Sequence, residues 1–272
     1  MPRLVILAGL AALLIVRAFG GTASRASAGA AHPGDEPEAL IAPPAPVAGP
    51  AGAVLQQLPD APGPRSVTLS RGSAARQVVH LSFDAGADRG YAEGILDTLR
   101  SEGVPASFGM TGQWAQANPD LVQRMVAEGH RLINHTWEHR SWTGLSDQRG
   151  HQSAPQIQAT LDRTESFLVD LTGQSTKPFV RPPYGDYDNP SLEATYNAGY
   201  GYSVMWTVDS FGWRRIPAAE IVARCLRLAE PGAIILMHVG VESRDGPALQ
   251  SVIAGLRERG YGFVSLTDLF ES

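Results

Sequence analysis

The sequence is poor in cysteine and has no excess of basic residues, and both shortages exclude classes of protein. Cys225 is the single cysteine among 272 residues, so the chain can form no internal disulfide. Its place inside a helix-like pattern suits a small buried hydrophobe. Lysine and arginine total 22 against 27 acidic residues, and no basic stripe with interleaved aromatic residues occurs. This charge balance argues against a partner that is a nucleic acid.

Long apolar runs are also absent. The longest, Leu4–Val16, follows a basic residue and precedes small residues with two A-x-A sites, which is the layout of a secretory signal peptide. As a helix this run spans about 20 Å, less than the ~30 Å hydrocarbon core of a bilayer. We predict that residues 1–30 are a signal peptide, or else an anchor within residues 1–20. Either alternative predicts a secreted or extracytoplasmic protein.

The next stretch has few large apolar residues and no internal repeat. Residues 31–65 are rich in alanine and proline, so they cannot bury enough surface to fold and are predicted to be a disordered linker. Residues 66–272 are long enough for one sizeable folded domain.

Strand-like and helix-like segments alternate through this domain. The predicted strands are Val78–Phe83, Ala106–Met110, Arg131–Asn134, Phe179–Arg181, Tyr202–Trp206, Ala233–Met237 and Phe263–Leu266. The predicted helices are Tyr91–Arg100, Pro119–Glu128, Ala154–Thr172, Ser191–Ala198, Ala218–Leu228 and Pro247–Arg257. This alternation predicts an α/β fold with a parallel sheet of about seven strands, most simply a closed or nearly closed (β/α) barrel. A doubly wound open sheet is the alternative.

Polar residues stand at the ends of these strands, and strand ends of a parallel sheet meet on one side. They are Asp84, His135 with His139, Arg181, Asp209 and His238. The two histidines are four residues apart, which is one helical turn and brings two imidazoles to one face. Imidazole pairs bind zinc, cobalt, nickel or iron, although this spacing also occurs by coincidence.

Other residues near the strand ends suit substrate binding or proton transfer. Arg181 is a natural partner for the Asp84 carboxylate, unless it is a solvated surface residue. The amide of Tyr184 is a candidate oxyanion donor, because the neighbouring prolines leave few free amides. His238 ends an apolar strand and is a candidate general acid. The aromatic residues of the next segment, Trp206 and Trp213, can stack on sugars or pack in the core.

With these residues in place, the chain from Gln77 to Phe270 resembles the polysaccharide deacetylases that share the NodB homology domain (carbohydrate esterase family 4). The matching segments occur in the family's order: Ser-Phe-Asp-x-Gly, His-Thr-x-x-His, Arg-Pro-Pro-Tyr-Gly, Trp206 to Trp213, and Leu-x-His. The resemblance implies a distorted barrel with fewer than eight strands. It also implies a divalent metal, zinc or cobalt, and the removal of acetyl groups from sugars.

The resemblance assigns roles by position. It makes Asp84 the general base, His135 and His139 the metal ligands, Arg181 the residue that orients the base, and His238 the general acid. The metal polarises the acetamide carbonyl and lowers the pKa of bound water.

Two positions depart from the family pattern. Ala85 stands where a second aspartate usually completes the metal site, and Gly212 stands where some members have an aspartate that tunes the catalytic histidine. Asp88 or Asp84 could supply the missing ligand, or two histidines and water could suffice. Asp209 could serve as the partner of the histidine.

The favoured interpretation is a metal-dependent hydrolase that removes acetyl groups from N-acetylated sugars of a cell-wall polysaccharide. Asp-x-Gly followed by Gly90-Tyr91 resembles the branch that acts on muramic acid of peptidoglycan; chitin-type oligomers are possible. One alternative is an acetyl-ester hydrolase on xylan-like polysaccharide. Another is a catalytically degenerate carbohydrate-binding module. The implied partner is the polysaccharide, and no protein partner is implied.

Overall fold

The computed structural model describes residue 58 and residues 63–271. The predicted signal peptide or anchor, residues 1–30, lies outside the described residues, as does nearly all of the predicted linker, residues 31–65. Within the described part of the chain, no helix is both long and apolar enough to cross a bilayer.

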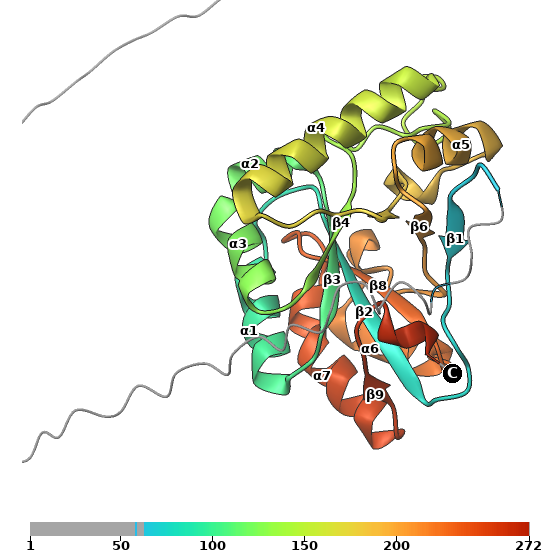
Figure 1. Ribbon diagram of the computed structural model, residues 1–272. Coiled ribbons are helices and arrows are strands. Elements are labelled where there is room, and N and C mark those ends of the chain that lie inside the picture. Colours follow the sequence, from blue (N-terminus) through green and yellow to red (C-terminus); the bar gives the residue numbers. More distant parts are fainter. Residues whose placement is uncertain (1–57, 59–62, 272) are drawn as a thin grey trace, which may run out of the picture. The chain divides into compact units, whose positions relative to one another are not determined.

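The domain is built on one curled sheet of parallel strands (Figure 1). The strands are β1 (Val67–Leu69), β2 (Val78–Ala85), β3 (Ala106–Met110), β4 (Arg131–Asn134), β5 (Phe179–Val180), β6 (Tyr202–Val204), β7 (Val208–Asp209), β8 (Ile234–His238) and β9 (Gly262–Phe263). Their order is β1-β6-β5-β4-β3-β2-β8-β7, and β9 pairs with β2. The two edge strands, β1 and β7, do not pair with each other, so the sheet is a half-barrel and not a closed barrel. The prediction of a distorted α/β barrel is confirmed.

Helices connect the strands and cover the outer side of the curled sheet (Figure 1). They are α1 (Ala92–Glu102), α2 (Gly112–Ala117), α3 (Pro119–Ala127), α4 (Ala154–Thr172), α5 (Asn189–Asn197), α6 (Ala218–Leu228) and α7 (Asp245–Glu258), with short 3-10 turns η2 (Pro183–Gly185), η3 (Gly212–Arg214) and η4 (Asp268–Phe270). The bounds of β3, β4, α4 and α6 agree with the prediction. Helix α4 ends at Gly173, whose φ of 72° is left-handed, as expected of a terminating glycine.

Several elements differ from the prediction. The last strand is Gly262–Phe263 instead of Phe263–Leu266, and β1, β7 and α2 were not predicted. The missed strands have only three and two residues, too few for a period of two to be recognised. Within the residues that the structure describes, the sheet therefore has nine strands instead of about seven.

The central strand β2 separates two different environments, because alternate side chains point to opposite sides of a sheet. On the outer side, toward α1 and α7, the side chains are apolar and fully buried: Val79, Leu81, Phe83 and Ala85. On the inner side they are polar: His80, Ser82 and Asp84. Each large apolar side chain buried on the outer side contributes roughly 1.5–3 kcal/mol. The last polar residue on the inner side, Asp84, lies near the carboxyl end of the strand.

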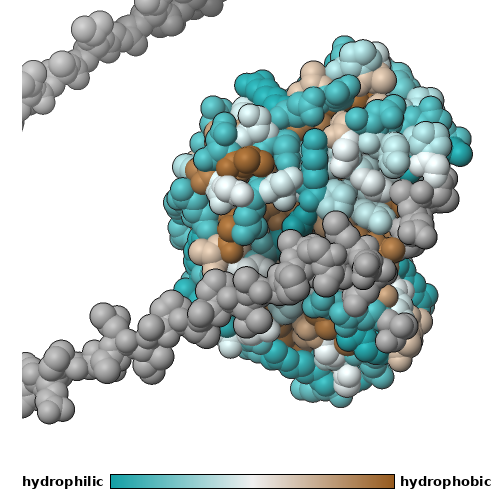
Figure 2. Space-filling view, in the orientation of Figure 1, coloured by the Kyte–Doolittle hydropathy of each residue, from teal (hydrophilic) through white to brown (hydrophobic). Residues whose placement is uncertain are grey.

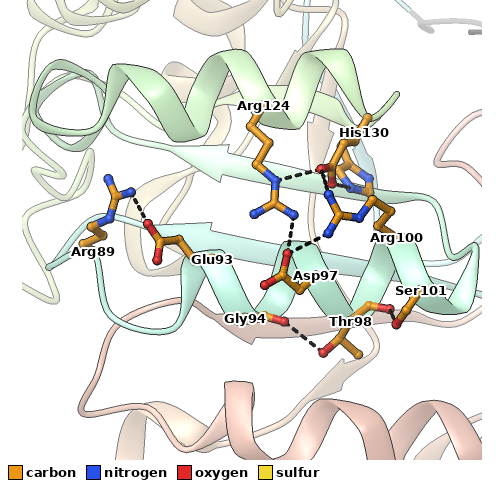
Figure 3. A network of polar contacts seen from close by, with 10 residues as sticks. Arg89, Glu93, Gly94, Asp97, Thr98, Arg100, Ser101, Arg124 and His130 are labelled. Atoms are coloured by element: carbon orange, nitrogen blue, oxygen red, sulfur yellow. Dashed lines mark hydrogen bonds and ion pairs between the residues drawn. The ribbon is translucent and has the colours of Figure 1, made fainter. Parts of the chain in front are cut away.

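The outer surface is mainly hydrophilic in the orientation of Figure 2, with hydrophobic residues in separate patches. Ion pairs join α1 to α3 on this surface (Figure 3). The guanidinium of Arg124 on α3 lies 2.7 Å from Asp97 on α1, and that of Arg100 on α1 lies 3.5 Å from Glu128 at the end of α3. These exposed pairs fasten two neighbouring helices and lie outside the barrel.

Candidate active site

A cavity of about 570 Å³ opens at the carboxyl ends of the strands. The predicted site residues that line it are Asp84, His135, His139, Tyr184, Trp206, Asp209, Trp213 and His238. Arg181 lies fully buried behind the cavity. The chain therefore brings together residues spread over more than 150 positions, as the parallel sheet predicts.

Asp84 and Arg181 form a buried ion pair at the end of β2. Arg181 Nη1 donates to Asp84 Oδ1 at 2.5 Å, Nε donates to the Val204 carbonyl at 2.9 Å, and Nη2 donates to Ser82 Oγ at 2.7 Å. Burial alone would raise the pKa of Asp84, but the charges of Arg181 and of nearby histidines outweigh it and hold that pKa below its usual value. Asp84 is thus an ionised carboxylate at the cavity, which is the form that a general base requires.

A chain of hydrogen bonds inside the barrel holds Arg181 in place. Ser82 Oγ lies 2.9 Å from Ser107 Oγ, which lies 2.8 Å from His80 Nε2, and His80 Nδ1 lies 2.9 Å from the Val264 carbonyl. Since that carbonyl can only accept, His80 Nδ1 donates and Nε2 accepts from Ser107. Burial lowers the pKa of His80 to about 4 and keeps it neutral. Every member of this chain therefore has one fixed hydrogen-bonding direction.

Gly109 makes room for the ion pair, which the sequence alone did not indicate. It is the register partner of Asp84 on β3, and a Cβ at this position would lie 2.5 Å from Asp84 Oδ1. A glycine inside a strand can mark the close approach of another group, and that was the available signal.

His135 and His139 lie side by side, with ring centroids 4.6 Å apart. His135 Nδ1 donates to the Arg181 carbonyl at 2.9 Å, so its Nε2 carries the lone pair. That Nε2 is buried, has no hydrogen-bond partner among the described residues, and lies 3.4 Å from Asp84 Oδ2. Burial lowers the pKa of both imidazoles, that of His139 to about 3. Both are neutral, as metal ligands must be.

From the sequence, the four-residue spacing of His135 and His139 was interpreted as one helical turn. That interpretation was wrong, because residues 135–139 form no helical turn. Thr136 and His139 have left-handed φ angles of 65° and 57°. The Asn134 side chain accepts from the Thr136 amide at 3.0 Å, and Thr136 Oγ1 accepts from the His139 amide at 3.1 Å. Side-chain hydrogen bonds thus fold this segment into a tight loop that places both rings at the cavity.

The donors present suit a divalent cation held by two imidazoles. Ala85, where the family usually has a carboxylate, is packed in the apolar cluster and does not line the cavity. Asp88 lines the cavity, and its Oδ1 accepts from the Val241 amide at 2.9 Å. Among the residues that the structure describes, no three His, Cys, Asp or Glu side chains form a group that could hold a metal. The orphaned Nε2 of His135 is the observation that favours a metal ligand here.

His238 stands beside Asp84, because the two are register partners on the neighbouring parallel strands β8 and β2. Burial lowers the pKa of His238, but Asp245, Asp84 and Asp209 together raise it above the usual value. A carboxylate whose ionised form is favoured therefore faces an imidazole whose protonated form is favoured, which suits a base and an acid that transfer protons in turn.

Asp209 is not the partner of His238 that the sequence suggested. Its Oδ1 accepts from the Phe211 amide at 2.8 Å and its Oδ2 accepts from Trp213 Nε1 at 3.2 Å. Asp245, in the first turn of α7, lies against His238 instead, with Oδ2 at 3.5 Å from Nδ1. Sequence reasoning missed Asp245, because an aspartate at the start of a helix is commonplace.

Aromatic side chains form one wall of the cavity. Tyr184 and Trp213 are each 49% exposed, and Trp206 lies between them along the chain. A Cβ at Gly185 would lie 2.9 Å from Trp206, and Gly185 has a φ of 72°, so only glycine fits there. Tyr184 itself has a left-handed φ of 61°, and its ring lies 4.4 Å from that of His139. Such backbone strain is typical of binding sites.

The fold and the site define a class of protein, an α/β half-barrel hydrolase with its reacting groups at the strand ends. A family model described as polysaccharide deacetylase matches residues 71–203. The chain belongs to the polysaccharide deacetylase family, and the predicted resemblance is confirmed.

Relatives of known name agree with this assignment. The peptidoglycan-N-acetylmuramic acid deacetylase PdaA of Bacillus subtilis is 31% identical over 201 residues, which cover 73% of each chain. Its solved structure, a family 4 carbohydrate esterase, has a TM-score of 0.67 and covers 80% of this chain and 87% of that one. The peptidoglycan-N-acetylglucosamine deacetylase of Bacillus cereus is 31% identical over 71% of this chain and 68% of its own. A Bacillus anthracis pseudoenzyme of the same family is 26% identical, with a TM-score of 0.68, over 75% and 69%.

Proposed function

We propose that this protein removes acetyl groups from N-acetylated amino sugars of peptidoglycan with the help of a divalent metal, and that it acts outside the cytoplasm. The observation that carries the proposal is the adjacency of Asp84, held by Arg181, and His238 on neighbouring strands, with the pKa of the carboxyl lowered and that of the imidazole raised. A binding module would need neither the buried ion pair nor the opposed pKa shifts.

The residues perform amide hydrolysis in two proton transfers. Asp84 takes a proton from the attacking water as the water oxygen adds to the acetyl carbonyl. The Tyr184 amide donates to the oxyanion that forms there. His238 then gives its proton to the departing amine nitrogen, so acetate and a free amino sugar leave. Arg181 keeps Asp84 ionised and oriented between turnovers.

A divalent cation fits the pair of neutral imidazoles of His135 and His139, and zinc is the best match to nitrogen ligands, with cobalt as an alternative. When bound, it polarises a carbonyl and acidifies water. The exposed rings of Tyr184 and Trp213 flank the cavity and suit the apolar faces of a sugar ring.

The test is acetate release by the purified chain after thorough chelation, with and without added zinc or cobalt. Peptidoglycan, N-acetylglucosamine oligomers and acetylated xylan are compared, with Asp84→Asn as the inactive variant. We expect release from peptidoglycan that requires metal. Release only from xylan would replace the amidase by an ester hydrolase. Binding of glycan without release from any substrate would establish a degenerate binding module, and equal rates after chelation would exclude the metal.

A further inference from the structure

His238 and its neighbour Asp245 each have one buried polar atom with no hydrogen-bond partner among the described residues. These atoms are His238 Nδ1 and Asp245 Oδ1. Asp245 is fully buried, and its other oxygen, Oδ2, lies 3.5 Å from His238 Nδ1. A buried carboxylate oxygen without a donor beside a buried imidazole nitrogen without an acceptor costs free energy, unless the two serve each other.

The carboxylate of Asp245 is fixed in this position by its own contacts. Its Oδ2 accepts from the His238 amide at 2.8 Å and from the Ser243 hydroxyl at 2.6 Å. These bonds tie the start of α7 to the end of β8. A slight turn of the His238 ring is then enough to close the 3.5 Å separation to a hydrogen bond, with Nδ1 as donor.

Gly212 on η3 leaves the space that Asp245 fills. A Cβ at residue 212 would lie 2.4 Å from Asp245 Oδ2 and 2.5 Å from Oδ1. A side chain at position 212 and the carboxylate of Asp245 therefore exclude each other. The glycine that departs from the family pattern and the aspartate that the sequence did not single out occupy one volume.

We propose that Asp245 is the positioning residue of His238, and that it delivers from α7 the carboxylate that the family resemblance places, in some members, at the position of Gly212. The inference rests on the proposed function only in the role given to His238; the His238–Asp245 contact stands by itself. In the proposed reaction, Nδ1–H of His238 donates to Asp245, which leaves the other nitrogen to hand its proton to the amine in the cavity. The carboxylate fixes the ring and favours its protonated form.

Other charged groups act on the same imidazole. Asp84 on β2 and Asp209 on β7 also raise the pKa of His238, and His135 and His139 beyond β4 face it from across the site. Asp245 differs from all of these because it is the carboxylate that makes an ion pair with Nδ1. Its removal is therefore expected to affect the acid and leave the base unchanged.

The experiment moves the carboxylate from one element to the other. Asp245→Asn and Asp245→Ala are compared with the double variant Gly212→Asp/Asp245→Ala and with Gly212→Asp alone. We expect both single Asp245 variants to lose kcat by about 100-fold, within the effect of a general acid, with KM little changed. The double variant is expected to recover most of that loss. Gly212→Asp alone places two carboxylates in one volume and is expected to be impaired.

A second readout does not depend on activity. The pKa of the His238 imidazole, followed by NMR in the purified full chain, is expected to fall by about one unit in Asp245→Asn and to return toward the wild-type value in the double variant. The basic limb of the kcat profile should move in the same direction. A double variant that folds but stays as inactive as Asp245→Ala, or an unchanged His238 pKa in Asp245→Asn, would overturn the inference. If the wild type releases no acetate at all, the proposed function fails, and the NMR titration still decides the role of Asp245.

Discussion

The two sides of β2 carry side chains of opposite character. On the inner side, His80, Ser82 and Asp84 lead into a continuous chain of hydrogen bonds that ends in the cavity. On the outer side, residues such as Leu81 pack in the apolar cluster beneath α1, whose exposed face carries ion pairs. One strand thus holds the proposed catalytic groups with one face and packs against the core with the other, because successive side chains point to opposite sides of the sheet.

The largest expected effect is on the inner side. Asp84→Asn preserves the shape of the side chain but removes the base, so kcat/KM for acetate release should fall by about 1,000-fold. It also leaves the buried Arg181 without its counter-charge, which is expected to lower the free energy of unfolding by about 3–5 kcal/mol. Steady-state kinetics and denaturant unfolding measure the two losses. Wild-type rates in the folded variant would remove Asp84 from the mechanism.

The outer side should respond in the opposite way. Leu81→Ala deletes a fully buried side chain and is expected to cost about 2–5 kcal/mol of unfolding free energy. Because this side chain points away from the cavity, kcat/KM of the folded enzyme should change less than about threefold. Unfolding curves and initial rates at a temperature where the variant is folded provide the check. A loss of activity as large as that of Asp84→Asn would contradict the separation of the two sides.

The same substitution, glycine to alanine, can be made on the inner side and on an outer helix, and the two variants compare the two sides directly. Gly109→Ala places a methyl group 2.5 Å from Asp84 Oδ1 and should lower kcat/KM by about 100-fold by displacing the carboxylate. Gly94→Ala, on the outer helix α1, meets nothing within 4 Å and should stabilise the helix by about 0.5–1 kcal/mol without affecting the rate. The prediction fails if both variants retain wild-type activity.

On the inner side, the buried His80 should make the free energy of unfolding depend on pH. Its pKa is about 4 in the folded protein because of burial, against 6.5 for the ordinary group. Between these values the unfolded chain binds the proton and the folded chain does not, so the stability linked to His80 is complete above pH 6.5 and is lost as the pH falls toward 4. Calorimetry of the wild type and of His80→Gln from pH 7 to pH 4 should show a shallower decline in the variant, by about one proton. Parallel declines would mean that His80 is already charged.

Much of the fold followed from the sequence because periodicity and strand-end residues are local signals. The four elements with matching bounds, β3, β4, α4 and α6, all have clear apolar patterns. The site residues on β2, β4, β5 and β8 came together as expected, because a parallel sheet directs all strand ends to one side.

What the sequence did not yield depends on contacts between distant segments. Asp245 and Gly212 share a volume although 33 positions separate them, and neither has a local pattern that announces it. The loop of His135 and His139 is shaped by the Asn134 and Thr136 side chains and not by a helical period. The hydrogen bonds that link His80 to Arg181 inside the barrel likewise form only when three strands are in register.

The smallest effect is expected at the exposed ion pairs between the outer helices α1 and α3. Asp97→Asn on α1 removes the charge that meets Arg124 and Arg100 in Figure 3. Asp97 is 58% exposed, so water and salt screen the pair, and the variant should lose only about 0.2–1 kcal/mol of unfolding free energy. Denaturant unfolding at low salt and at 1 M salt should show that this small difference vanishes at high salt, whereas the deficit of Asp84→Asn persists because its partner Arg181 is fully buried. If both deficits disappeared with salt, the interior pair would be as accessible to solvent as the surface pair, and the distinction between the two sides of β2 would not hold.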